Sequence, residues 1–234
     1  MRPVAEADRL RTALLAAVGH DLRRPLAAAT AAVTSLRSSE LTLSDSDNTE
    51  LLATADESLE SLASLVTKLL DVSRLQAGVL GVSLEPVTLD EIIGGALDEL
   101  GLAPGDVQLE LGEVPPVTAD PTLLQRALVN IVTNALRFSP EGVPPVIATS
   151  HFDERVQLRV IDAGPGIPIE RREDAFVAFQ RLGDTDNTTG VGLGLALSKG
   201  FVEAMGGTLE PEDTPGGGLT MVIDLSAATQ EDAE

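Results

Sequence analysis

The chain has 234 residues, no cysteine, and 37 acidic residues against 16 basic ones, a formal net charge of −21 at pH 7. Without cysteine, disulfides, thiolate metal sites and a cysteine nucleophile are excluded. The negative charge argues against nucleic-acid binding because it repels a polyphosphate backbone, and the few aromatic residues, five Phe and no Trp or Tyr, leave little for stacking on bases. No apolar stretch approaches the roughly 18 to 20 residues that cross a bilayer, so we expect no direct membrane contact.

The first 78 residues predict two helices joined by a polar loop. Apolar residues of the first helix recur every three or four positions: Leu10, Leu14, Val18, Leu22, Leu26, Ala29, Val33 and Leu36. The stretch 38–48 is rich in Ser, Thr, Asp and Asn, which indicates a loop. The second helix has a heptad pattern, which requires a helical partner: Leu52, Ala55, Leu59, Leu62, Val66 and Leu69. One helical hairpin cannot bury both stripes, so we predict a dimeric four-helix bundle.

Residues 79–228 have the pattern of a mixed α+β domain, and an acidic tail follows at 229–234. Short β-type runs predict strands at 84–89, 107–111, 145–150, 156–161 and 219–225. Helical patterns cover 90–100, 121–138 and 191–205. About 150 residues is a usual size for one domain of this kind.

The two histidines have different surroundings. His20 lies in the run GHDLRRP at 19–25 and points roughly 170° away from the apolar stripe of its helix, toward solvent. Asp21 can polarise the imidazole and leave a neutral nitrogen as nucleophile, while Pro25 removes one helical hydrogen bond nearby. By itself, an exposed His-Asp pair is also typical of an ordinary solvated surface. His151 falls among the expected strands, and we interpret it as structural.

The helix at 121–138 has a second group of candidate residues on its polar side. Asn130, Asn134 and Arg137 lie within about 60° of one another around the helix. Amide oxygens suit a hard cation such as Mg²⁺, which often reaches phosphates through waters. Arg137 can bind a phosphate directly. An ordinary solvated helix face remains the alternative.

A glycine-containing turn follows the strand expected at 156–161. Asp162 ends the strand, and Gly164 and Gly166 allow a ligand to approach the backbone closely. The carboxylate can accept a hydrogen bond from an exocyclic amine such as that of adenine. A simple turn is the alternative.

A second glycine motif precedes the helix expected to end at 205. Gly190, Gly192 and Gly194 would expose backbone N–H groups to a phosphate at the helix N-terminus. The motif alone is weak, because it has neither the strand context of a dinucleotide-binding fingerprint nor the Gly-Lys-Ser/Thr of a P-loop.

The four motifs occur in a characteristic order: His-Asp-x-x-x-Pro, Asn-x-x-x-Asn, Asp-x-Gly-x-Gly and Gly-x-Gly-x-Gly. In this order the chain resembles the sensor histidine kinases, from about residue 9 to residue 225. Segments 11–18 and 179–184 are similar to the potassium-responsive members of the family from high-GC Gram-positive bacteria. The implied fold is a dimerisation and phosphotransfer hairpin at 1–78, followed at 79–228 by an ATP-binding α+β two-layer sandwich shared with Hsp90 and gyrase.

The resemblance implies a role for each matching residue. His20 would be the phosphoacceptor and Asp21 its general base. Asn130 would be catalytic and, with Asn134, would hold Mg²⁺. The implied ATP contacts are Arg137 at a phosphate, Phe138 beside the adenine, Asp162 at the adenine amine with Gly164 and Gly166 shaping its turn, Phe176 and Phe179 before the ATP lid, Arg181 at the triphosphate end, and Gly190, Gly192 and Gly194 over the phosphates.

The implied activity is ATP-dependent autophosphorylation of His20 in a homodimer, with the phosphate then passed to an aspartate of a response-regulator receiver domain, in control of potassium uptake. We expect a hinge near Gly78, and a chain that is the cytoplasmic part of a membrane-anchored protein. One residue departs from the family pattern: Arg24 stands where Thr or Asn commonly positions a water for dephosphorylating the regulator. Because a guanidinium cannot accept a hydrogen bond, we expect weak or altered phosphatase activity with intact kinase activity.

Two other interpretations are compatible with parts of the sequence. A related ATPase or serine kinase with the same nucleotide fold would lack the hairpin that carries His20. A non-catalytic dimeric scaffold, or pseudokinase, could bind a response regulator without using ATP. Nucleotide binding separates the scaffold from the enzyme.

Overall fold

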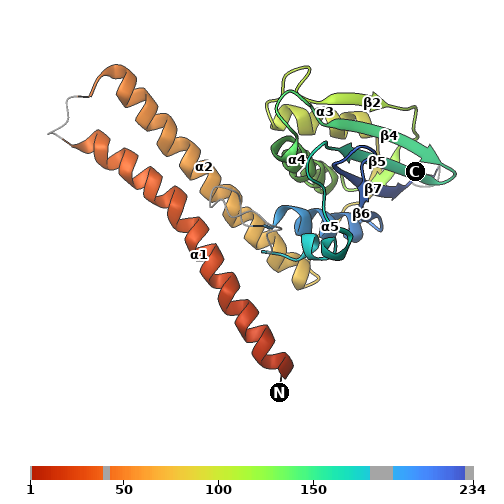
Figure 1. The fold of residues 1–234 in the computed structure, drawn as a ribbon, viewed down its shortest axis with the longest axis horizontal. Helices are drawn as coiled ribbons and strands as arrows, with labels where there is room; N and C mark the ends of the chain where they lie inside the picture. Colours follow the sequence, from red (N-terminus) through yellow and green to blue (C-terminus); the bar gives the residue numbers. More distant parts are fainter. Residues whose placement is uncertain (1, 39–42, 180–191, 230–234) are drawn as a thin grey trace. The chain divides into compact units, whose positions relative to one another are not determined.

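The computed structural model describes residues 2–38, 43–179 and 192–229 (Figure 1). The chain divides into two compact units, a helical unit that extends to Arg74 and an α/β unit that begins at Leu75. The predicted fold class is confirmed: a helical hairpin precedes a sandwich of helices on a mixed sheet. The domain limits expected at residues 78 and 228 stay predictions. Within the described ranges, no helix is both long enough and apolar enough to span a membrane.

The helical unit contains α1 (Arg2–Arg37) and all but the last two residues of α2 (Asp45–Gln76). The predicted loop at 38–48 is wrong in its last four residues, because α2 already begins at Asp45. Ser44 precedes the helix, and its N–H donates to Asp47 Oδ2 at 2.9 Å while the Asp47 N–H donates to Ser44 Oγ at 3.1 Å. This reciprocal pair is a capping box. The Ser and Asp residues that indicated a loop therefore start a helix.

The hairpin buries only part of its apolar surface. Among the hairpin residues whose side chains are described, the buried apolar ones are mostly small: Ala29, Ala32, Ala55 and Leu65. Two rows with heptad spacing, one on each helix, are between 41% and 60% exposed: Leu26 and Val33 on α1, and Leu52, Leu59 and Val66 on α2. A single hairpin thus leaves half of the predicted heptad seam uncovered.

The α/β unit contains a five-stranded mixed sheet in the order β2-β4-β5-β7-β6. Its strands are β2 (Gln108–Leu111), β4 (Val146–Phe152), β5 (Arg155–Ile161), β6 (Thr208–Asp213) and β7 (Leu219–Ser226). The β2–β4 pair is parallel, and the other neighbours are antiparallel. A smaller sheet pairs β1 (Glu85–Val87) with β3 (Val117–Ala119).

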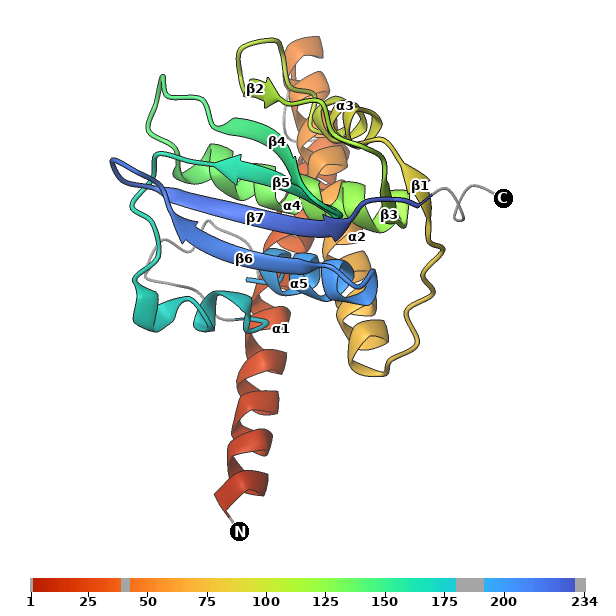
Figure 2. The ribbon, with the colours of Figure 1, turned by 90° about the vertical axis from the view of Figure 1, so that its right-hand side faces the viewer.

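Three helices cover one face of the large sheet (Figure 2): α3 (Leu89–Glu99), α4 (Pro121–Phe138) and α5 (Gly194–Ala204). The core lies between these two layers. Strand β5 alternates as expected for a half-covered strand, with Val156, Leu158 and Val160 buried. Helix α4 buries the arc that its periodicity predicted, so its polar edge is left for other contacts.

Several element boundaries differ from the predictions. The strand expected at 84–89 is limited to β1, because Leu89 already begins α3. The helix expected from 191 begins at Gly194, while residue 191 lies outside the described ranges. Strands β3 and β6 were not predicted: β3 has three residues, and β6 contains Pro211 and three acidic residues. A proline is tolerated there because β6 is an edge strand that pairs only with β7.

Candidate functional site

His20 lies on α1 with its side chain 54% exposed. Its Nδ1 is 2.9 Å from Asp21 Oδ1, and the Asp21 side chain is mostly buried. When Nδ1 carries the proton and donates it to this carboxylate, Nε2 retains its lone pair. The carboxylate therefore favours the tautomer in which Nε2 can act as a nucleophile.

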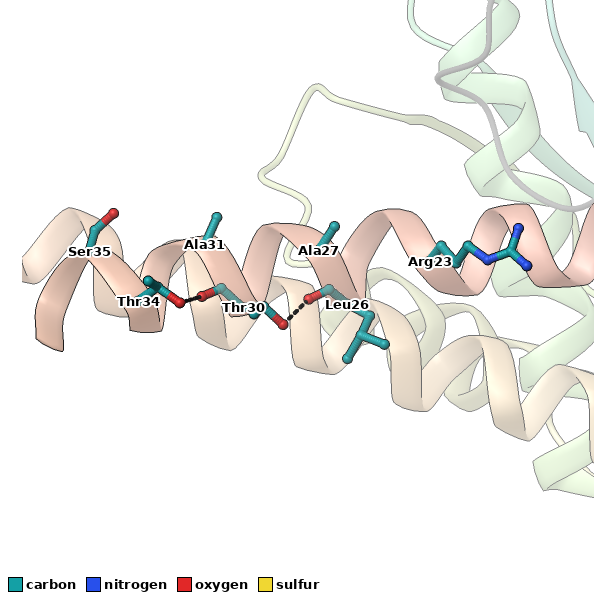
Figure 3. A pocket seen from close by; sticks show the side chains of 7 residues that line it. All are labelled: Arg23, Leu26, Ala27, Thr30, Ala31, Thr34 and Ser35. Atoms are coloured by element: carbon teal, nitrogen blue, oxygen red, sulfur yellow. Dashed lines mark hydrogen bonds between the residues drawn. The ribbon is translucent and has the colours of Figure 1, made fainter. Parts of the chain in front are cut away.

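An open pocket follows His20 along α1 (Figure 3). Seven side chains line it: Arg23, Leu26, Ala27, Thr30, Ala31, Thr34 and Ser35. The hydroxyls of Thr30 and Thr34 donate back to backbone carbonyls one turn earlier, each at 2.7 Å, so these two residues present methyl groups. At about 100° per residue, the pocket centres within roughly 40° of the direction of His20. A molecule that reaches His20 from this side would contact the pocket.

Asp162 is a buried carboxylate of the α/β unit, with 7% of the residue exposed. Its Oδ1 accepts hydrogen bonds from the backbone N–H groups of Gly164 at 2.8 Å and Leu219 at 3.1 Å. Burial raises the pKa of this carboxyl, and the two hydrogen bonds partly oppose the shift. Among the described residues, no group donates to Oδ2. The carboxylate is thus held by one oxygen, and the other is left for a ligand.

The turn after Asp162 lies directly against the end of α4. A Cβ built at Gly164 would lie 2.7 Å from the Phe138 carbonyl oxygen and 3.0 Å from Asp162 Oδ1, so only glycine fits. The Phe138 side chain is half exposed, and the Arg137 guanidinium lies 4.8 Å from the centre of its ring. The structure therefore brings together four predicted residues at this end: Arg137, Phe138, Asp162 and Gly164.

A second group of predicted residues lies at the start of α5. Gly194 is its first residue, and a Cβ built there would lie 3.8 Å from Asn130 Cγ and Oδ1 on α4. The buried Ser198 hydroxyl lies 3.0 Å from the Gly194 carbonyl and 3.2 Å from that of Ala127, which ties the two helices together. Leu193 supplies no side-chain cap to α5. Within the described part of the chain, Leu193 leaves the first N–H groups of α5 uncapped, so these groups can bind an anion beside Asn130.

Gly192, two residues before α5, is hydrogen-bonded to Phe179. Gly192 has φ +70°, and its carbonyl accepts from the Phe179 N–H at 2.9 Å. Phe179 also has a left-handed φ of +70°. Arg181 and Gly190, which the motifs singled out, lie outside the described residues.

The two groups lie along one edge of α4. Asn130 and Phe138 are eight residues apart, which corresponds to about 12 Å along a helix. One end offers backbone N–H groups and the Asn130 and Asn134 amides, and the other offers a carboxylate beside an aromatic ring. An elongated ligand with an anionic end and an amine-bearing end matches this arrangement.

The donor set also fits a hard cation that is shared with phosphates. Within the described chain, no group of three or more His, Cys, Asp or Glu side chains could hold a metal. A cation at the anionic end would therefore depend on the Asn130 and Asn134 amides together with ligand oxygens and water. Mg²⁺ prefers such oxygen ligands and keeps several of its waters.

Sequence reasoning missed the contribution of the β6–β7 turn. The Leu219 N–H holds Asp162 Oδ1, and Gly218 lies against the Asp162 carbonyl. The run Gly216-Gly217-Gly218 was the available signal, because three consecutive glycines indicate an unusual backbone path. His151, interpreted as structural, has its Nδ1 3.1 Å from the Glu113 carbonyl oxygen.

Comparison with known proteins agrees with this division. Residues 10–78 match the His Kinase A (phospho-acceptor) domain, and residues 119–229 match the Histidine kinase-, DNA gyrase B-, and HSP90-like ATPase family. The solved structure of the mycobacterial sensor histidine kinase MprB is 32% identical, with a TM-score of 0.53, over 62% of this chain and 97% of that one. The chain belongs to the sensor histidine kinases.

Among the sensor histidine kinases, the chain is similar to the KdpD sensor proteins. The sensor protein KdpD of Rathayibacter rathayi is 55% identical over 98% of this chain, and that of Mycobacterium tuberculosis is 50% identical over 96%. The predicted resemblance to high-GC Gram-positive members is confirmed. The match covers 27% of the length of each relative.

Proposed function

We propose that the chain is the catalytic core of a two-component sensor kinase that uses Mg²⁺ and ATP to phosphorylate His20. The observation that carries the proposal is that two groups of candidate ligand-binding residues lie along one edge of α4. One group contains the buried Asp162 carboxylate, and the other contains the N-terminus of α5. A non-catalytic scaffold would have no use for this arrangement.

Adenine would bind at the Asp162 end. The free oxygen Oδ2 would accept a hydrogen bond from the exocyclic amine, while Phe138 would cover the ring. Gly164 and Gly166 would let the base approach the backbone. Because Asp162 is buried, this single bond discriminates strongly between an amine and a group that cannot donate.

The phosphates would lie at the Asn130 end. The first N–H groups of α5 and the backbone at Gly192 and Gly194 would bind them, and Asn130 and Asn134 would hold Mg²⁺. A bound Mg²⁺ would neutralise charge on the phosphate oxygens. Arg137, which lies over the Phe138 ring in the structure, would turn toward the phosphates, and the predicted Arg181 and Gly190 would complete the contacts.

The reaction would join His20 Nε2 to the γ-phosphorus and break the bond from that phosphorus to the bridging oxygen, so that ADP leaves. As the N–P bond forms, the imidazole gains positive charge, and Asp21 stabilises it by accepting the Nδ1 proton. Positioning and charge neutralisation supply most of the rate enhancement of phosphoryl transfer. The step requires the nucleotide unit to reach His20, and we place the hinge near Gly78, whose φ is +66°.

The helical unit would form a homodimer. The two exposed heptad rows are an incomplete coiled-coil seam, and a second copy would cover them in a four-helix bundle. Burial against this second copy would explain why large apolar residues, among them Leu52 and Leu59, are exposed in a single chain.

The partner in the next step would be a response-regulator receiver domain, whose aspartate takes the phosphate. The pocket that follows His20 on α1 supports this proposal, since it presents small and apolar groups on the face that carries the imidazole. By the likeness to the KdpD sensor proteins, we propose that the output is control of potassium uptake.

The deciding experiment is incubation with Mg²⁺ and γ-labelled ATP. Wild type and His151→Gln should acquire acid-labile, base-stable label, and His20→Gln should acquire none. His151 is a matched control because it is the other histidine of the chain. Nucleotide binding without label in the wild type would contradict the kinase proposal and favour the scaffold.

A further inference from the structure

We infer that the β6–β7 hairpin orients the Asp162 carboxylate. Gly218 would be a positioning residue in this hairpin, and Arg172 would link the hairpin to the turn that follows Asp162. The inference rests on the proposed function, in which Asp162 recognises the base. It concerns residues outside the four motifs of the sequence.

Gly218 makes the tightest approach of the hairpin to the turn. It is buried, and a Cβ built on it would lie 1.9 Å from the Asp162 carbonyl oxygen and 2.9 Å from Ala163 Cα. Both atoms belong to the backbone and cannot rotate away. The contact is reciprocal, since a Cβ at Gly166 would lie 2.8 Å from the Gly218 carbonyl oxygen. Any side chain at position 218 must therefore displace the Asp162 backbone.

The residue after Gly218 sets the direction of the carboxylate. The Leu219 N–H donates to Asp162 Oδ1 at 3.1 Å, and the Leu219 carbonyl accepts from the Asp162 N–H at 2.8 Å. Oδ1 is thereby fixed toward the hairpin, which turns Oδ2 away from it. A displacement of the hairpin would rotate Oδ2 relative to the bound base.

Arg172 links the far side of the turn to the same hairpin. Its Nε donates to the Ile167 carbonyl at 3.4 Å, its terminal nitrogen donates to the Pro211 carbonyl at 3.3 Å, and it forms an ion pair with Asp213. Pro211 and Asp213 lie at the end of β6. A lysine could keep the charge but not this branched set of contacts.

The same turn offers a position for a control substitution. Gly216, Gly217 and Gly218 have φ values of +95°, +110° and +116°, so alanine is strained at each position. A Cβ at Gly216 or Gly217 would meet nothing within 4 Å. Gly217→Ala therefore shares the backbone strain of Gly218→Ala without the contact to Asp162.

The test is isothermal titration calorimetry with Mg·ADP and with Mg·inosine diphosphate, in which a carbonyl replaces the amine that Asp162 would bind. We expect Gly218→Ala to lower ADP affinity roughly 10- to 100-fold, the effect of losing one hydrogen bond to a charged group. Affinity for inosine diphosphate should stay nearly constant, because the phosphate end is intact. Gly217→Ala should keep the wild-type preference for ADP, although both variants melt at lower temperature.

Different outcomes overturn different claims. Equal ADP preference in Gly218→Ala and Gly217→Ala would refute the positioning role and leave the proposed function standing. A wild type that binds neither nucleotide would refute both. If Gly218→Ala does not fold, the same titrations are made with Arg172→Lys and with a control at its exposed neighbour, Arg171→Lys. The preference for ADP over inosine diphosphate should fall only in Arg172→Lys. An equal preference in the two variants would overturn the inference.

Discussion

Replacing Asp162 by Asn should separate ligand binding from fold stability. The amide oxygen can keep the hydrogen bonds from Gly164 and Leu219, so the NH₂ group replaces Oδ2 and would face the amine of the proposed adenine ligand. Losing a hydrogen bond to a charged acceptor costs about 1.5 to 3 kcal/mol, which corresponds to roughly a 10- to 150-fold weaker Kd. The fold, in contrast, is relieved of a carboxylate whose pKa burial raises.

The assays are calorimetric titration with Mg·ADP and thermal unfolding without ligand. Asp162→Asn should bind ADP at least about tenfold more weakly and should melt no lower than the wild type. Asp120→Asn is the matched control, because Asp120 is also buried but uses both oxygens, accepting from the N–H groups of Leu123 at 3.0 Å and Ser83 at 2.9 Å. It should lose stability and keep ADP affinity. A parallel loss of melting temperature and affinity in Asp162→Asn would refute the reasoning.

Four further predictions concern pH and the helical unit. Burial raises the pKa of Asp162 above its ordinary 3.8, so the stability of the wild type relative to Asp162→Asn should decrease as the pH rises from about 4 through the raised pKa. Denaturant titrations of both proteins at several pH values measure this difference in the free energy of unfolding. The hydrogen bonds from the Ser44 N–H and hydroxyl lower the pKa of Asp47, so Ser44→Ala should reduce the melting temperature at pH 7, and the difference should shrink as the pH falls through that lowered pKa. Leu59→Glu should dissociate the proposed dimer in sedimentation analysis; an unchanged mass would contradict the exposed heptad row as the interface. Arg24→Thr should accelerate dephosphorylation of the regulator while leaving autophosphorylation intact, and a wild type that is already the faster phosphatase would show this idea to be wrong.

The sequence predicted best where local signals agree with the final packing. Helix α4 has the predicted bounds because Asp120 caps it, Pro121 begins it and its apolar arc is continuous. The hairpin was predictable for the same reason. Strand β6 was not, since Pro211 and its acidic residues carry no strand pattern, and its formation depends on pairing with β7.

The candidate site shows the same limit. Asn130 and Asp162 were recognisable from motifs because each motif is contiguous. The contacts of Gly218 and Arg172 join segments tens of residues apart, and no local pattern specifies which turn will lie against which carboxylate. Propensity and periodicity describe short segments, whereas these contacts arise only when the sheet order places β7 beside β5.

The inner position of β7 has a consequence for the order in which the protein matures on the ribosome. The helical hairpin is complete once Gln76 is made, but β7, which ends at Ser226, lies between β5 and β6, and its first residue holds Asp162. At about 5 to 20 residues per second, roughly 8 to 30 s separate the two events. During that interval the nascent chain would have the proposed acceptor His20 but not the proposed adenine site at Asp162. If the proposed function holds, a truncated translation product that ends before β7 would compete for the proposed dimer partner and regulator without being able to bind ATP.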